Sequence, residues 1–152
     1  MLAERFSLVV HKDSRPIPTW TLNVGKKPML KPADGSGDGG CKIQTKVGGG
    51  VGLNFLFSCR NLSMADFAAG LSGMRGVDIG REAVLDQTGL KGAWNFDVTW
   101  SPIGAPSLPG QTEAPITVFE ALDKQLGLKL ELRKRPVPVL VIDHIEEMPT
   151  DN

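Results

Sequence analysis

The stretch LKLELRKRPVPVLVIDH, residues 128–144, decides the fold of this chain because a related stretch lies near the other end. LVVHKDSRPIPTWTLNV, residues 8–24, has a similar order of side chains and aligns with it without a gap. In both stretches an alternating apolar pattern, typical of a strand, precedes an Arg-Pro-aliphatic-Pro motif, Arg15–Pro18 or Arg135–Pro138. Since proline fixes φ and has no backbone N–H, each motif predicts a tight corner followed by a returning strand.

The repeat extends to residues 1–24 and 121–144, so each copy is predicted to begin with the end of a helix. In the first copy Met1 falls partway through that helix, and a helix of one turn is unstable by itself. We therefore expect the chain to be the C-terminal part of a longer product, whose missing portion could carry an export signal or a membrane anchor.

Bulk composition excludes several classes of protein. The 152 residues are 41% apolar and 22% charged, and 17 Lys and Arg balance 17 Asp and Glu. A chain without net charge has no overall field to attract a phosphate backbone, so nucleic-acid binding is disfavoured. The apolar runs are strand-sized, well short of the roughly 20 residues needed to span a bilayer. No signal peptide is recognisable at residues 1–5.

Local signals place two main helices in the C-terminal part. Ser63 with Asp66, and Thr117 with Glu120, have the spacing of helix N-caps, and Gly127 suits a left-handed C-cap. Strand patterns flank both helices, which gives a βαββαββ-like order from residue 53 onward. We predict an α+β fold of repeated helix–strand–strand units with mixed or antiparallel sheets.

Three regions are expected along the chain. Residues 1–30 form an N-terminal helix end and β-hairpin, and residues 53–148 form the βαββαββ-like domain, packed with 1–30 as one globule. Residues 31–52 contain two glycine-rich segments and are predicted to be a flexible linker, interrupted by a short segment, Cys41 to Val47.

Several apolar residues are assigned to the core. Trp20, Trp94 and Trp100 share strand parity with other apolar residues, so burial is favoured over a ligand groove. Phe119 is expected on the buried stripe of the second helix, and Leu132 on the buried face of the strand that follows. Val139 to Ile142 is apolar on both faces, which predicts an inner strand.

Three segments resemble a soil-associated bacterial protein family of unknown function. They are Leu2–His11, Val84–Gly92, and Gln125–Leu130 with Val139–His144, and the likeness covers nearly the whole chain. Members of that family are typically longer at the N-terminus, and many are exported or fused to membrane metallopeptidases of the antibiotic-sensor type. The resemblance implies a periplasmic or secreted module, with a membrane protein as one kind of partner. The order of elements from Leu53 is also similar, more weakly, to the short N-terminal domain of secretins and TonB-dependent receptors.

The two cysteines leave two interpretations open. Cys41 and Cys59 are too widely spaced for a CxxC redox or zinc motif. In an exported protein they could form a disulfide that fastens the linker to the strand at Leu53. The alternative is two thiols, Cys59 in the core and Cys41 in a loop.

Other candidate chemistry is weaker. Asp34, Ser36 and Asp38 imitate the start of a calcium loop, but Thr45 stands where a bidentate glutamate is needed. His11 and His144, the only histidines, are interpreted as strand-end residues. We predict no catalytic, cofactor-binding or metal-binding residues and no cofactor.

The leading hypothesis is a non-catalytic, extracytoplasmic binding or sensing module that contacts a protein or small molecule, for example by strand addition at an open sheet edge. One alternative is a hydrolase-type enzyme using Asp97, Asp143 or His144 in a cleft between the repeats. Another is a structural accessory domain of a larger membrane protein.

Overall fold

The computed structural model describes residues 7–47, 52–80, 83–107 and 109–145. The chain divides into two compact units. Unit 1 comprises Met1–Pro18 and Lys134–Asn152, and unit 2 comprises Thr19–Arg133. These boundaries differ from the predicted regions 1–30, 31–52 and 53–148.

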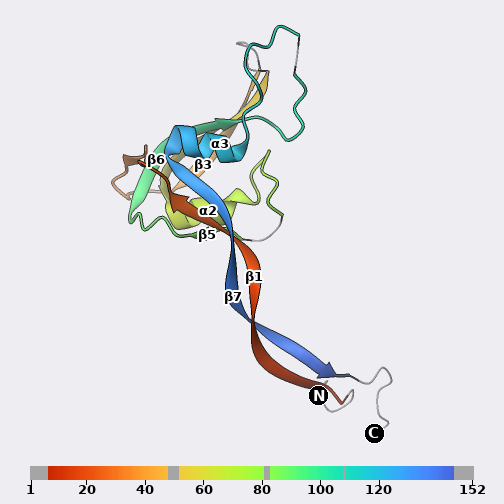
Figure 1. The fold of residues 1–152 in the computed structure, drawn as a ribbon. Helices are drawn as coiled ribbons and strands as arrows, with labels where there is room; N and C mark the ends of the chain where they lie inside the picture. Colours follow the sequence, from red (N-terminus) through yellow and green to blue (C-terminus); the bar gives the residue numbers. More distant parts are fainter. Residues whose placement is uncertain (1–6, 48–51, 81–82, 108, 146–152) are drawn as a thin grey trace. The chain divides into compact units, whose positions relative to one another are not determined.

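Two long strands run through both units. β1 (Val9–Val24) and β7 (Leu128–His144) are neighbours in a three-stranded sheet of order β5-β1-β7. In unit 1 they form a two-stranded antiparallel ribbon, Val9–Pro18 with Lys134–His144, which we call the ribbon (Figure 1).

The predicted corners are therefore wrong, because Arg15–Pro18 and Arg135–Pro138 continue their strands without a turn. Proline is compatible with extended backbone where its nitrogen faces a free edge, so an edge strand can pass through such a motif. The sequence repeat nevertheless aligns β1 with β7, so both copies of the repeat form a strand.

Unit 2 is built on a four-stranded antiparallel sheet of order β2-β6-β4-β3. The strands are β2 (Lys31–Pro32), β3 (Gly40–Val47), β4 (Leu53–Ser63) and β6 (Ala93–Trp100). The short strand β5 (Leu85–Asp86) pairs in parallel with β1 at Thr21 and Leu22.

Two strands, β2 and β3, lie inside residues 31–52, and β3 coincides with the segment Cys41–Val47 that interrupts the predicted linker. β3 pairs with β4 along its whole length, from Gly40 opposite Arg60 to Val47 opposite Leu53. This pairing supplies the hydrogen bonds that an isolated glycine-flanked segment lacks. Gly48–Gly50 lie outside the described residues.

The helices begin where the sequence predicts. α2 (Met64–Leu71) has Ser63 as its N-cap, and α3 (Val118–Ala121) begins with the Thr117–Glu120 capping box. A π-helical turn, η1 (Leu122–Leu126), follows directly, and Gly127 closes it at φ 68°. Glycine adopts this left-handed conformation without the strain that a Cβ brings, which confirms its predicted role as C-cap.

One hydrophobic core fills unit 2. The ring of Phe57 on β4 stacks on Trp100 of β6 at 4.2 Å, and Phe67 of α2 meets Phe96 edge-on at 4.8 Å. The helices and the ends of β1 and β7 complete the core with Met64, Leu71, Leu122, Leu126, Leu22, Leu128 and Leu130. The predicted α+β class, with mixed and antiparallel sheets, is confirmed.

Three predictions of burial are wrong. Phe119 is 39% exposed and packs against Trp20, and Leu132 is 54% exposed. Val139–Ile142 is not in an inner strand, because β7 lies at the edge of its sheet. Of the three tryptophans, Trp100 is fully buried, whereas Trp20 and Trp94 are partly buried against the core.

Candidate functional site

A disulfide joins the two cysteines, with 1.96 Å between the sulfur atoms. Cys41 on β3 lies directly opposite Cys59 on β4, and Cys59 is fully buried. The bond therefore fastens the edge strand β3 to the hydrophobic core of unit 2.

Asp97, one of the carboxylates considered for catalysis, is held by an arginine. The Nη1 and Nη2 atoms of Arg60 donate to Oδ1 and Oδ2 of Asp97 at 3.0 and 3.3 Å. Nη1 also donates to the backbone oxygens of Cys59 and Phe96. Hydrogen bonds from Arg60, and next from Ser58, hold the pKa of Asp97 below its ordinary value. A carboxyl group whose ionised form is stabilised in this way is a poor general acid.

Asp143, the second such carboxylate, is bonded to a histidine from the other strand of the ribbon. Nδ1 of His11 lies 2.6 Å from Oδ2 of Asp143, and both side chains are exposed. The sequence contains no sign of this pair, since its members are 132 positions apart. His144, the next residue, is exposed at the end of β7.

The calcium-like segment forms a local turn. Oδ1 of Asp34 accepts a hydrogen bond from the backbone N–H of Ser36 at 3.0 Å. This bond is the main reason that the pKa of Asp34 is lowered. In the parts of the chain that the structure describes, no three His, Cys, Asp or Glu side chains gather as metal ligands.

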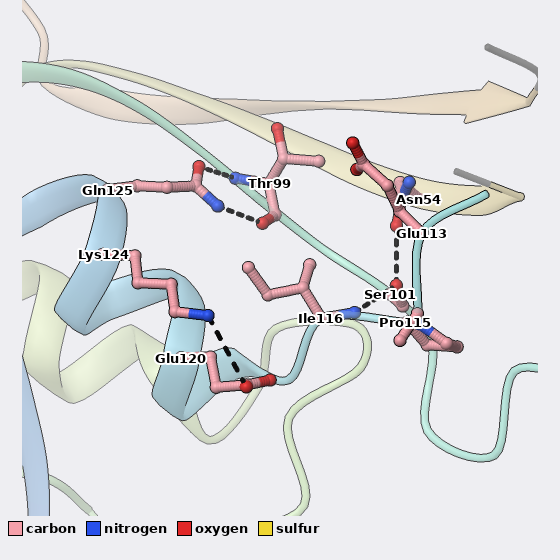
Figure 2. Close-up of a pocket in the computed structure, with 10 residues that line it drawn as sticks. Asn54, Thr99, Ser101, Glu113, Pro115, Ile116, Glu120, Lys124 and Gln125 are labelled. Atoms are coloured by element: carbon pink, nitrogen blue, oxygen red, sulfur yellow. Dashed lines mark hydrogen bonds and ion pairs between the residues drawn. The ribbon is translucent and has the colours of Figure 1, made fainter. Parts of the chain in front are cut away.

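A pocket of about 510 Å³, lined by both polar and apolar side chains, lies in unit 2 beside β6 (Figure 2). At one end, Oγ of Ser101 donates to Oδ1 of Asn54 at 2.7 Å and accepts from the backbone N–H of Ile116. Asn54 and Ser101 are both buried, so this pair satisfies polar groups inside the fold. At the mouth, Nζ of Lys124 lies 3.8 Å from Oε1 of Glu120. The pKa of Glu120 is lowered chiefly by the backbone hydrogen bond from Thr117.

Gln125 lines the same pocket, and its side-chain amide makes the backbone hydrogen bonds with β6 that a neighbouring strand would otherwise make. Its Oε1 accepts from the backbone N–H of Thr99 at 2.9 Å, and its Nε2 donates to the carbonyl of Thr99 at 2.7 Å (Figure 2). β2 pairs with β6 at Trp94 and Asn95, and Ser101 N–H donates to the carbonyl of Ile116. Together these contacts close the outer edge of β6. Sequence reasoning missed Gln125, because a glutamine on a short helical turn carries no signal of its partner.

The ribbon of unit 1 exposes aliphatic side chains on both strands. Val9 and Val10 on β1 are 53% and 43% exposed, and Leu140 and Ile142 on β7 are 67% and 59% exposed. Among the described residues, β5 is the only other strand of this sheet, and it pairs with β1 at Thr21 and Leu22 in unit 2. Aliphatic side chains gathered on an unpaired sheet edge are typical of an interaction surface.

The outer edge of β7 is the one that faces away from β1. Prolines close one part of this edge to backbone hydrogen bonding and leave the other part open. Pro136 and Pro138 lack the N–H that a partner strand would need, so their nitrogens are expected to face the outer edge. Alternate residues of a strand share an edge. Leu140 and Ile142 therefore direct their backbone N–H and C=O groups outward, where strand addition can use them.

A family model described as "Protein of unknown function (DUF3738)" matches residues 1–145. The chain belongs to the DUF3738 family. This confirms the predicted family of unknown function that covers nearly the whole chain. The predicted soil association, export, fusion to membrane metallopeptidases and likeness to secretin domains stay predictions.

The comparison with curated proteins and the comparison with solved structures gave no match for this DUF3738 chain. Within the described residues, no helix has the length and apolar character needed to cross a membrane.

Proposed function

We propose that this DUF3738 protein is a non-catalytic, extracytoplasmic binding module that takes up a protein partner by strand addition to the outer edge of β7. The observation that carries the proposal is the exposure of Leu140 and Ile142 on the edge strand β7. Their parity with Pro136 and Pro138 is expected to direct their backbone groups outward. Main-chain hydrogen bonds would provide the affinity, and the aliphatic side chains on both faces would provide the specificity.

The titratable groups support a non-catalytic role. Asp97 is paired with Arg60, and His11 with Asp143. Glu120 accepts the hydrogen bonds of a helix cap. Each of these groups thus has a structural partner.

The disulfide supports an extracytoplasmic location. Structural disulfides persist in oxidising compartments and are rare in the cytosol. Cys41 and Cys59 stand in direct register on paired strands, one of them inside the core. Mass spectrometry of host-isolated protein, alkylated without reductant, is expected to show no free thiol; two alkylated cysteines would contradict export.

Binding is tested by closing the edge of β7. In Leu140→Pro the new proline has the same parity as Pro136 and Pro138, so it removes only an outward N–H. In the matched control, Leu140→Val, the backbone N–H stays, and the side chain remains aliphatic and suits a strand.

With the immobilised protein as bait for host envelope proteins, we expect partners retained by the wild type to be reduced at least tenfold on Leu140→Pro. Leu140→Val should keep them. Equal capture by the wild type and Leu140→Pro would refute strand addition at this edge.

A further inference from the structure

A second pocket, of about 250 Å³, lies in unit 2 between the loop that follows β6 and the beginning of α3. Its apolar lining includes Ile103, Ala105, Val118 and Phe119. Ile103 is 61% exposed and Phe119 is 39% exposed, so apolar surface is open to solvent here. Small-molecule sites are concave and mostly apolar, and those for drug-sized ligands measure roughly 300–1,000 Å³. This pocket therefore suits a smaller molecule.

The wall that carries Asp78 is held in place by the buried indole of Trp100. Nε1 of Trp100 donates to the carbonyl of Arg75 at 2.7 Å. Gly76 permits this close approach, because a Cβ at that position would lie 2.9 Å from Nε1 of Trp100. Ile79, the residue after Asp78, is buried in the core. Asp78 thus stands between two anchored segments of backbone.

The other walls are also bonded into the fold. The backbone N–H of Ser101 donates to the carbonyl of Ile116 at 2.9 Å, and in the loop the N–H of Ala105 donates to the carbonyl of Pro102 at 3.1 Å. The Thr117–Glu120 capping box fixes the first turn of α3. The pocket is therefore formed before a ligand arrives, which lowers the cost of binding.

The charge of the pocket comes from one residue. Among the described residues that line it, Asp78 has the only charged side chain. Its carboxylate makes no hydrogen bond or ion pair with another described residue. In the larger pocket, by contrast, Lys124 lies 3.8 Å from Glu120. An unpaired carboxylate beside apolar side chains is complementary to a ligand that combines an apolar body with a positive charge.

We propose that this pocket binds a small organic cation with an apolar body and one ammonium group. The apolar body lies against Ile103 and Phe119, and the ammonium group pairs with the carboxylate of Asp78. The proposal adds a small-molecule ligand to the proposed function. It concerns unit 2 alone and does not rest on strand addition at β7.

Phenethylamine and phenethyl alcohol are the probes that test the proposal, because they share a ring and a chain and differ in the charged group. Probes of about nine non-hydrogen atoms bind weakly, so we expect a Kd of about 1 mM for the amine. The alcohol should bind about fivefold more weakly, since the carboxylate is exposed and its attraction is screened. In NMR titrations, saturable shifts should be confined to backbone amides of residues 76–79, 101–105 and 116–119.

Asp78→Asn keeps the size of the side chain and removes its charge. The amine should bind this variant about fivefold more weakly than the wild type, whereas binding of the alcohol should not change. Unchanged binding of the alcohol also shows that the pocket of the variant is intact. Asp123→Asn is the matched control, because it makes the same change at an exposed residue outside this pocket. It should bind both probes as the wild type does.

Three results would overturn the proposal. The first is no saturable shift at up to about 20 mM amine, well above the expected Kd. The second is a set of shifts centred on acidic side chains outside the pocket, which would indicate unspecific attraction of a cation. The third is equal affinity of the wild type and Asp78→Asn for the amine, which would remove the role of the carboxylate. None of these results bears on the edge of β7.

Discussion

The outer edge of β6 in unit 2 is covered by other segments, whereas the outer edge of β7 in the ribbon of unit 1 is not, within the described residues. In unit 2, β6 is closed by β2, by the side chain of Gln125 and by the backbone of Ile116. The edge strand β3 is covalently fastened to β4 and carries the exposed lysines Lys42 and Lys46. In the ribbon, β7 presents Leu140 and Ile142 without such protection.

The contrast is between β6 and β7, because β3 also ends its sheet and exposes Ile43 and Val47 beside its lysines. Natural sheets protect their edges with charges, prolines, short strands or covering segments, because unpaired edges invite association. Unit 2 uses several of these devices. An edge left aliphatic within the same chain is therefore expected to have a partner.

The largest expected effect contrasts the core with the ribbon. Phe57→Ala removes a fully buried ring that stacks on Trp100, so we expect the free energy of unfolding to fall by about 3–5 kcal/mol. Ile142→Ala, on the exposed ribbon, should change it by less than about 0.5 kcal/mol in the monomer. Urea unfolding followed by far-UV circular dichroism, which reports on the strands of both units, measures both. Similar losses in the two variants would show that the ribbon is covered within the monomer.

An intermediate effect is expected where a side chain closes an edge. Gln125→Ala leaves the N–H and C=O of Thr99 without their partner, which should cost about 1–3 kcal/mol and speed amide exchange at Thr99. Gln125→Glu keeps the acceptor but places a carboxylate oxygen against the carbonyl of Thr99, so it should not restore the stability. Lys124→Ala, next to it and exposed, is the control. Unchanged amide exchange in Gln125→Ala would mean that Thr99 is protected by other contacts.

The smallest effect concerns pH. Because the folded pKa of Asp97 is lowered, its ion pair with Arg60 stabilises the fold above the unfolded carboxyl pKa. This contribution is lost as the pH falls through the lower folded value. The side chain is 53% exposed, so screening keeps the contribution below about 1 kcal/mol. In Asp97→Asn the stability should fall less on acidification than in the wild type; equal acid profiles would show that the ion pair contributes nothing.

Local signals in the sequence predict the local structure well. Ser63, Thr117 with Glu120, and Gly127 mark the ends of the helical segments, because a cap depends on residues three or four positions away. The alternation of Trp94, Phe96, Val98 and Trp100 likewise predicts β6 and its inward face.

Features that depend on distant segments are not predictable in this way. The motifs Arg15–Pro18 and Arg135–Pro138 indicate a corner, whereas an edge strand accommodates them in extended form. Strand β3 depends on pairing with β4, and the bond between His11 and Asp143 on the pairing of β1 with β7. A strand apolar on both faces predicts burial, but the pattern does not say whether the covering segment belongs to the same molecule.

The proline pairs also limit the size of an assembly. Pro16 and Pro18 interrupt the donors along the outer edge of β1, and Lys12 adds a charge to it. Once a partner strand is added to β7, the enlarged sheet still ends in this blunted strand on the β1 side. Repeated strand addition should therefore stop at β1, so that concentrated solutions stay clear of fibres.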